Sequence, residues 1–347
     1  MKVLLVGDLH LFDKELSTTK GFRENNTVML ERLYDYLKEH EEVCLCIFEG
    51  DIQHKTPSAK DSLYHVSRWK HWLHKIGDLM AERLPEIAVI PREGNEKNEN
   101  HPMPSPLFTL KGNHDMASEL RSSVDYTLFD DLLFEGILRN PKGIVYKDAG
   151  KRYYIQFNNY QEADAPVPEE ILKEKDIKVV KLFHDAIDVP TQGTWVKLDK
   201  KAFNGSDVLQ NTHLGIAGHI HDPLKPVVVE TLNGKKSIFL QTGSMGRTSA
   251  ADGNVRDHGY CTVLDTTDGL KVTEVKVPLI PSEDYFDWGA IMYNQQQRDA
   301  LKNRKNFNVS LGDYERKSYD PKEDIKNMDI TEDVKENCLN VLDNVEK

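Results

Sequence analysis

Short apolar runs alternate along the chain with longer amphipathic stretches. Each run is rich in Val, Ile, Leu or Phe and ends in a polar cluster, which is typical of a strand buried on both faces. The runs are Val3–Val6, Val43–Phe48, Leu107–Leu110, Val179–Phe183 and Leu214–Ala217. Apolar residues recur at helical spacing over residues 25–40 and 59–84, in the intervals between the first three runs. This alternation of strand and helix predicts an α/β fold.

The pattern changes after residue 237. Ile238–Gln241, Tyr260–Leu264 and Val272–Val277 follow one another as strands with no helix between them, which predicts a second and more antiparallel sheet. From residue 285 onward the chain is polar, with helical spacing over residues 332–346. We therefore expect a main domain over residues 1–284 and a short helical extension over residues 285–347.

Composition and charge fit a folded protein of the cytoplasm. The 347 residues are 39% hydrophobic and 29% charged, and the formal net charge is -12. Such an acidic chain does not attract nucleic acid through its overall field. The apolar run at the N-terminus stops at Gly7, too early for a signal peptide, and no stretch approaches the ~20 apolar residues that span a bilayer. We therefore expect no membrane partner. The four cysteines form no C-x-x-C pair, so we expect free thiols and no structural zinc site.

Polar clusters follow the five apolar runs directly. They are Gly7-Asp8-Leu9-His10, Gly50-Asp51-Ile52-Gln53-His54, Gly112-Asn113-His114-Asp115, His184-Asp185 and Gly218-His219-Ile220-His221. Ligands of open α/β sheets bind beyond the carboxyl ends of the strands, where these clusters lie. Taken singly, a Gly-Asp or Asp-x-His pair is more often a surface turn. Their arrival together at five strand ends favours a binding site.

The donor types point to metal ions. Carboxylate, amide and imidazole donors without thiolates favour divalent ions such as Mn²⁺, Fe²⁺ or Zn²⁺. Six or seven donors are too many for one ion and fit two ions that share a bridging carboxylate. Two metals about 3.5–4 Å apart can clamp the attacking and leaving oxygens of a phosphoryl displacement. The clusters therefore predict phosphoester hydrolysis.

The order of the clusters resembles that of the calcineurin-like metallophosphoesterases over about residues 1–265. The resemblance implies a two-sheet α/β sandwich flanked by helices, with two divalent ions, Mn²⁺ foremost and Mg²⁺, Fe²⁺ or Zn²⁺ as alternatives. It assigns Asp8, His10, Asp51 and His221 to the first metal, and Asp51 as a bridge, Asn113, His184 and His219 to the second. It also implies that His114 is the acid that protonates the leaving group. Asp115 is expected to orient the His114 imidazole.

The second cluster and a later segment, residues 241–244, indicate which substrate class is expected. Protein phosphatases of this superfamily carry G-D-x-V-D-R-G, whereas this chain has Gly50-Asp51-Ile52-Gln53-His54-Lys55 and lacks the phosphate-binding Arg. His54 with the following Pro57-Ser58 resembles G-D-L-F-H-x-x-x-P-S of the SbcD-type DNA repair nucleases, and implies a supporting catalytic role for His54. Gln241-Thr242-Gly243-Ser244 resembles the Q-P-G-S segment of the same family.

Two functions therefore remain open. The first is a metal-dependent DNA exo- or endonuclease, with DNA as partner and an SbcC-like ATPase subunit or a second copy of this chain as further partners. The second is a stand-alone phosphodiesterase that acts on a nucleotide or another small phosphoester. SbcD-type proteins usually continue into a capping domain, which is expected to be truncated or absent here. The apolar positions over residues 330–345 could dock an ATPase coiled coil, or equally fold back on their own domain. Local cations that could hold DNA near the clusters are Lys55, Lys60, Arg121 and Arg247.

Overall fold

The computed structural model describes residues 1–12, 16–54, 63–92, 105–116, 127–191, 194–195, 202–248, 255–267, 269–298 and 335. The chain divides into two compact units, Met1–Ile291 and Met292–Lys347. The predicted helix over residues 332–346 and its docking face lie outside the described residues, apart from residue 335. No helix among the described residues is long and apolar enough to cross a membrane.

The predicted boundary at residue 284 falls inside a packed cluster. Tyr285 and Phe286 are fully buried beside Phe12 and Phe22, and Ile291 packs partly against them. The first residues of the predicted extension therefore belong to the first unit.

One of the two large sheets has five strands in the order β16-β15-β1-β2-β4. Its strands are β1 (Lys2–Val6), β2 (Val43–Phe48), β4 (Leu107–Thr109), β15 (His258–Asp265) and β16 (Lys271–Pro278). The pairs β1–β2 and β2–β4 are parallel, so the carboxyl ends of these three strands meet at one edge. The pairs β1–β15 and β15–β16 are antiparallel.

The other large sheet has seven strands in the order β13-β14-β12-β7-β6-β5-β3. Its strands are β3 (Ile87–Ile90), β5 (Gly143–Asp148), β6 (Lys151–Asn158), β7 (Ile177–Phe183), β12 (Leu214–Ala217), β13 (Leu224–Glu230) and β14 (Lys236–Gln241). The four central strands β14, β12, β7 and β6 are mutually parallel. The remaining short strands are β8 (Ile187–Asp188), β9 (Pro190–Thr191), β10 (Thr194–Trp195) and β11 (Phe203–Asn204).

The expectation of a separate sheet after residue 237 is wrong. β14 joins the seven-stranded sheet parallel to β12, whereas β15 and β16 extend the five-stranded sheet. Both sheets are therefore mixed, and each combines strands from before and after residue 237. The two multi-stranded sheets with flanking helices confirm the predicted α/β sandwich.

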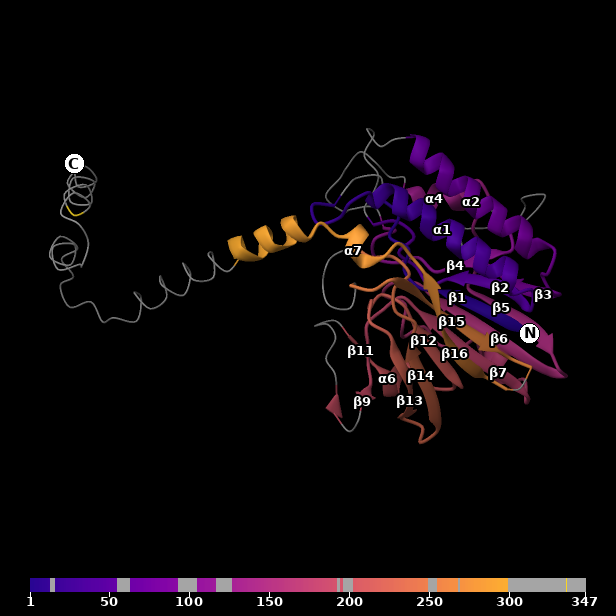
Figure 1. Cartoon of the computed structure of the whole chain (residues 1–347). Coiled ribbons are helices and arrows are strands. Elements are labelled where there is room, and N and C mark those ends of the chain that lie inside the picture. Colours follow the sequence, from indigo (N-terminus) through magenta and orange to yellow (C-terminus); the bar gives the residue numbers. More distant parts are fainter. Residues whose placement is uncertain are drawn as a thin grey trace, which may run out of the picture. The chain divides into compact units, whose positions relative to one another are not determined.

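Helices cover the five-stranded sheet on the side away from the other sheet (Figure 1). They are α1 (Phe22–Glu39), α2 (Leu63–Ala81) and α4 (Leu128–Phe134). Short helices α5 (Glu169–Leu172), α6 (Gly205–Val208) and α7 (Ser282–Tyr285) lie in connections, and a further helix begins at residue 288. α1 and α2 confirm the two amphipathic stretches that the sequence indicates.

Alternation along β1 shows how the layers form. Leu4 and Val6 pack with residues of α1, α2 and α4, whereas Val3 and Leu5 pack between the two sheets. Successive side chains of a strand point to opposite faces, so an uninterrupted apolar run serves both layers. The chain therefore places β1 in the middle of the molecule, with its carboxyl end at the edge where the polar clusters gather.

Candidate metal centre

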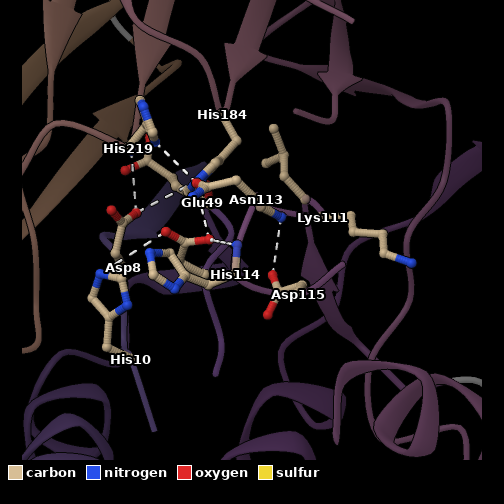
Figure 2. A network of polar contacts seen from close by, with 12 residues as sticks. Asp8, His10, Glu49, Lys111, Asn113, His114, Asp115, His184 and His219 are labelled. Carbon is tan, nitrogen blue, oxygen red and sulfur yellow. Dashed lines mark hydrogen bonds and ion pairs between the residues drawn. The ribbon is translucent and has the colours of Figure 1, made fainter. Parts of the chain in front are cut away.

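Side chains from five strand ends converge on one site (Figure 2). The five-stranded sheet supplies Asp8 and His10 after β1, Asp51 after β2 and Asn113 after β4. The seven-stranded sheet supplies His184 after β7, and His219 and His221 after β12. The structure thus brings together all seven residues that the sequence proposes as metal ligands, and it draws them from both sheets.

Asp8, His10 and His221 form one group of possible ligands, with one donor atom of each within 4.8 Å of the others. The Nε2 atoms of His10 and His221 are 2.8 Å apart, and Nε2 of His221 is 3.8 Å from Oδ2 of Asp8. Oδ2 of Asp8 is buried and has no hydrogen-bond partner among the described residues. A buried carboxylate oxygen facing imidazole nitrogens is a donor set that suits a divalent cation.

Asp51, His184 and His219 form a second group of the same kind. Oδ1 of Asn113 lies 3.3 Å from Nε2 of His184 and 3.1 Å from Nδ1 of His219, which adds a fourth donor. His184 donates from Nδ1 to the carbonyl oxygen of Glu49 at 2.6 Å, and this contact directs Nε2 toward Asp51 and Asn113.

Asp51 faces both groups. Its Oδ2 is 3.9 Å from Nε2 of His10, and its Oδ1 is 3.2 Å from Nε2 of His184. A carboxylate that bridges two ions presents one oxygen to each of them. Asp8 also has one oxygen near each group, but its Oδ1 lies 3.8 Å from Nδ1 of His184, the nitrogen that donates to the carbonyl of Glu49. Asp51 is therefore the carboxylate of the two groups whose oxygens face a ligand nitrogen on each side.

The backbone is strained where ligands leave their strands. φ is 53° at His10, 45° at Asp51 and 70° at His219, in the left-handed region that most residues avoid. Such conformations persist where surrounding contacts enforce them, and they cluster at functional sites. Asp, Asn and His tolerate this region better than most side chains, so these residue types suit both the backbone and the chemistry.

The glycines of the clusters leave space for ligand side chains. A Cβ at Gly112 would lie 2.1 Å from Oδ1 of Asp51, and one at Gly50 would lie 2.3 Å from Nδ1 of His184. The Gly-Asp and Gly-Asn pairs in the sequence therefore mark places where a ligand lies directly against the backbone.

The histidines carry different charges in the absence of metal. Burial lowers the pKa of His221 to about 4 and holds the pKa of His10 well below its usual range, so both rings are neutral at pH 7. Burial also acts to lower the pKa of His184, but the neighbouring Asp51 and Asp8 outweigh it and raise that pKa to about 10. Burial raises the pKa of Asp51, but His184 and His10 outweigh it and hold that pKa well below its usual range. The proton on His184 thus balances the negative charge of Asp51, which a divalent cation would balance when bound.

His114 and His54 lie side by side at the edge of this site. Their rings are stacked, with centroids 5.4 Å apart and an interplanar angle of 14°. Nδ1 of His114 donates to the carbonyl oxygen of His54 at 2.5 Å, which leaves Nε2 of His114 for a substrate. One donor atom from each of these two rings lies within 4.8 Å of a His10 nitrogen.

Asp115 does not orient the His114 imidazole, contrary to the prediction from the sequence. Its Oδ1 accepts the backbone N–H of Gln53 at 3.1 Å, and its Oδ2 accepts that of Gly112 at 2.9 Å. The tight turn after Gly112 directs the carboxylate back into the backbone, so the carbonyl of His54 takes the place expected for Asp115. Asp115 thus fixes two ligand loops against each other.

The sequence pattern does not predict a second buried carboxylate beside Asp51, and the structure places Glu49 there. Its side chain is fully buried, and burial raises its pKa to about 7 against the lowering effect of Thr242 and His184. The signal that could have found it is a carboxylate at the end of an otherwise apolar strand, one residue before the Gly-Asp pair.

The prediction that Arg247 holds DNA is wrong, because the Arg247 side chain is buried. Its guanidinium donates to the carbonyl oxygen of Arg256 and to Oδ1 of Asn25, and it lies 4.0 Å from the ring centroid of Tyr285. The other expected cations, Lys55, Lys60 and Arg121, lie outside the described residues.

Comparison with known proteins places this site in a family. The model of the calcineurin-like phosphoesterases matches residues 1–223, which include all seven converging residues. No curated protein sequence matches the chain.

Comparison with solved structures found two chains similar to this one. One is a Staphylococcus aureus protein described as a 5′-nucleotidase, in complex with α-ketoglutarate. It is 14% identical, with a TM-score of 0.44, and the match covers 86% of this chain and 58% of that chain. An archaeal phosphodiesterase is 11% identical, with a TM-score of 0.34 over 80% of this chain and 99% of that chain. This chain therefore spans less than two thirds of the length of the Staphylococcus aureus protein. The family match over residues 1–223, together with the converging donors, identifies this chain as a member of the calcineurin-like phosphoesterases, which are metal-dependent hydrolases of phosphoesters.

Proposed function

We propose that this chain is a dinuclear metal-dependent phosphodiesterase, and that its substrate is DNA. The observation that carries the dinuclear centre is the division of Asp51, whose two oxygens face separate groups of donors. Asp8, His10, Asp51 and His221 would hold one ion, and Asp51, Asn113, His184 and His219 the other. Mn²⁺ is the first candidate, with Mg²⁺, Fe²⁺ and Zn²⁺ as alternatives. When bound, the ions supply a nucleophile at neutral pH and neutralise charge on the phosphate.

The chain's own residues supply the proton that the leaving group needs. His114 keeps Nδ1–H on the carbonyl of His54, so the imidazolium would donate from Nε2 to the departing oxygen. A sugar alkoxide is a poor leaving group, and its departure depends on such a proton. The neighbouring ring of His54 lies where it could contact the same phosphate or leaving group.

The pairing of His54 with His114 supports a nuclease of the SbcD type. The resemblance of the second cluster to that family includes His54, and the stacked rings bring it to the edge of the metal site. An SbcC-like ATPase and a second copy of this chain are the proposed protein partners.

The charge of the chain favours the second candidate, a phosphodiesterase for a nucleotide or another small ester. The net charge is -12, and the buried Arg247 cannot contact a DNA backbone. A small phosphodiester needs few contacts beyond the metals, whereas duplex DNA needs several cations along its backbone.

We expect the purified protein with Mn²⁺ to hydrolyse duplex DNA faster than bis-p-nitrophenyl phosphate at equal phosphodiester concentration. Single-stranded DNA and a dinucleotide are assayed beside them, with and without chelator. Few phosphate contacts imply a shallow salt dependence of DNA binding, about -0.9 in log–log slope for each contact. If the protein hydrolysed only the small esters, the second candidate function would be correct and the DNA nuclease wrong. If it hydrolysed none of the substrates, both candidate functions would be wrong.

Metal binding is expected to release a proton. His184, whose pKa is raised to about 10, carries a proton at pH 8 without metal, whereas a ligand imidazole must be neutral. Affinity for Mn²⁺ should therefore increase as the pH rises toward about 10 and decrease as the pH falls. Calorimetric titrations in buffers of different ionisation enthalpy measure the number of protons released. Binding enthalpies that do not depend on the buffer would show that His184 keeps its proton and is not a ligand.

A further inference from the structure

The side chain of Gln53 joins three parts of the molecule. It is fully buried in the loop after β2, between Asp51 and His54. Its Nε2 donates to the backbone carbonyl of His114 at 2.9 Å, and its Oε1 accepts the backbone N–H of Leu128 at 2.9 Å. Leu128 is the first residue of α4, where N–H groups have no partner within the helix. One amide thus connects two loops of the metal site to the start of a helix.

His114 is fixed at both backbone atoms and at its ring. Its N–H donates to Oδ1 of Asp51 at 2.9 Å, its carbonyl oxygen accepts from Gln53, and its Nδ1 donates to the carbonyl of His54. The first and last of these partners belong to the same loop as Gln53. Loss of the Gln53 contact would remove the hydrogen bond to the carbonyl of His114, while the other two contacts and the bonds of Asp115 to Gly112 and to the backbone of Gln53 remain. A modest displacement of His114 is therefore expected, without loss of the turn.

We propose that Gln53 is a positioning residue for His114, which holds the imidazole at the angle needed to protonate the leaving group. The inference rests on the proposed function, because it assigns to Gln53 a role in the same proton transfer. A displacement of about 1 Å at a reacting group can lower a rate by ~10²-fold. A buried amide with both ends hydrogen-bonded is well suited to prevent such a displacement, because breaking either contact leaves a buried polar group without a partner.

The two contacts at position 53 suit a glutamine side chain. The contact with His114 needs a donor and the contact with Leu128 needs an acceptor, and a side-chain amide supplies both. The related motif G-D-L-F-H has phenylalanine here, which can make neither contact. The connection between Gln53 and His114 is therefore a feature of this chain rather than of the motif.

Two variants separate the two hydrogen bonds. Gln53→Met removes both, whereas Gln53→Glu keeps an acceptor for Leu128 and removes the donor to His114. We expect both to lower kcat about tenfold or more on a dinucleotide and less on bis-p-nitrophenyl phosphate, whose leaving group needs little protonation. KM and the content of Mn²⁺ should stay within about twofold of the wild-type values, because no metal ligand is removed.

Thr127→Ala is the matched control for α4. Thr127 caps this helix through its contact with Asp130 and has no contact with His114. It should lower the melting temperature, which we also expect of the Gln53 variants because they remove a hydrogen bond or its donor, and it should leave kcat unchanged on both substrates. A fall in kcat with Thr127→Ala equal to that with Gln53→Met would show that Gln53 acts only through the stability of α4, and would overturn the inference.

A double-mutant cycle tests whether the effect passes through His114. In the His114→Ala background, Gln53→Met should cause no further loss of kcat, because the group that it positions is gone. An undiminished loss in that background overturns the inference but leaves the proposed function intact, since the wild-type protein still hydrolyses the substrate.

A spectroscopic measurement keeps the inference testable if the wild-type protein hydrolyses none of these substrates. In protein loaded with diamagnetic Mg²⁺, the ring signals of His114 are assigned by their absence from His114→Ala. They should shift and broaden in Gln53→Met and stay unchanged in Thr127→Ala. Unchanged His114 signals in Gln53→Met would overturn the positioning role independently of any activity.

Discussion

Asp51→Ala is expected to abolish hydrolysis and to lower the metal content of the protein at the same time. Asp51 faces both groups of donors, so its removal takes one ligand from each ion. The lost charge stabilisation amounts to several kcal/mol, or ~10³-fold or more in kcat. Elemental analysis and rate measurements on the same preparation provide the test.

Two further variants make this result specific. Asp51→Asn keeps the size of the side chain and tolerates the left-handed backbone at φ 45°, so a loss of metal there reflects weaker ligation rather than misfolding. Asp185→Asn is the control, because Asp185 is a buried carboxylate next to His184 that accepts the N–H of Gln161 at 2.9 Å. It should keep both metals. Two metals bound at full occupancy in Asp51→Ala would refute the bridging role.

His114→Gln is expected to keep both metals while hydrolysis of DNA falls by ~10²-fold or more, the usual scale for loss of a general acid. Hydrolysis of bis-p-nitrophenyl phosphate should fall less, because p-nitrophenolate departs without a proton. His74→Gln, an exposed change on α2, is the control and should have no effect. If His114→Gln slowed both substrates equally, His114 would have a role other than proton donation.

The strands that carry the site are well predicted from the sequence, because each combines a buried apolar run with a polar end. It does not reveal which strands pair. β14 is a strand as expected, but its partner β12 is set by packing across the molecule, which local periodicity does not report.

The hairpin of β5 and β6 shows a different limit. Its strands are joined by Ala149 and Gly150, both with positive φ, as tight hairpin turns require. Asn-Gly or Asp-Gly usually signals such a turn, and alanine at the first position conceals it. Asp115 shows the same limit for a side chain, because its motif fixes its place in the sequence but not which groups its carboxylate meets.

Because the candidate donors come from both sheets, bound metal ions would also cross-link the fold. The ion held by Asp8, His10, Asp51 and His221 would join β1 and β2 to β12, and the ion held by Asp51, Asn113, His184 and His219 would join β2 and β4 to β7 and β12. An ion that binds only the folded chain raises the free energy of unfolding by about 1.4 kcal/mol per site for each tenfold rise in its concentration above Kd. Thermal stability should therefore increase with the supply of divalent metal, and the lifetime of the protein in a cell would follow the availability of the ion.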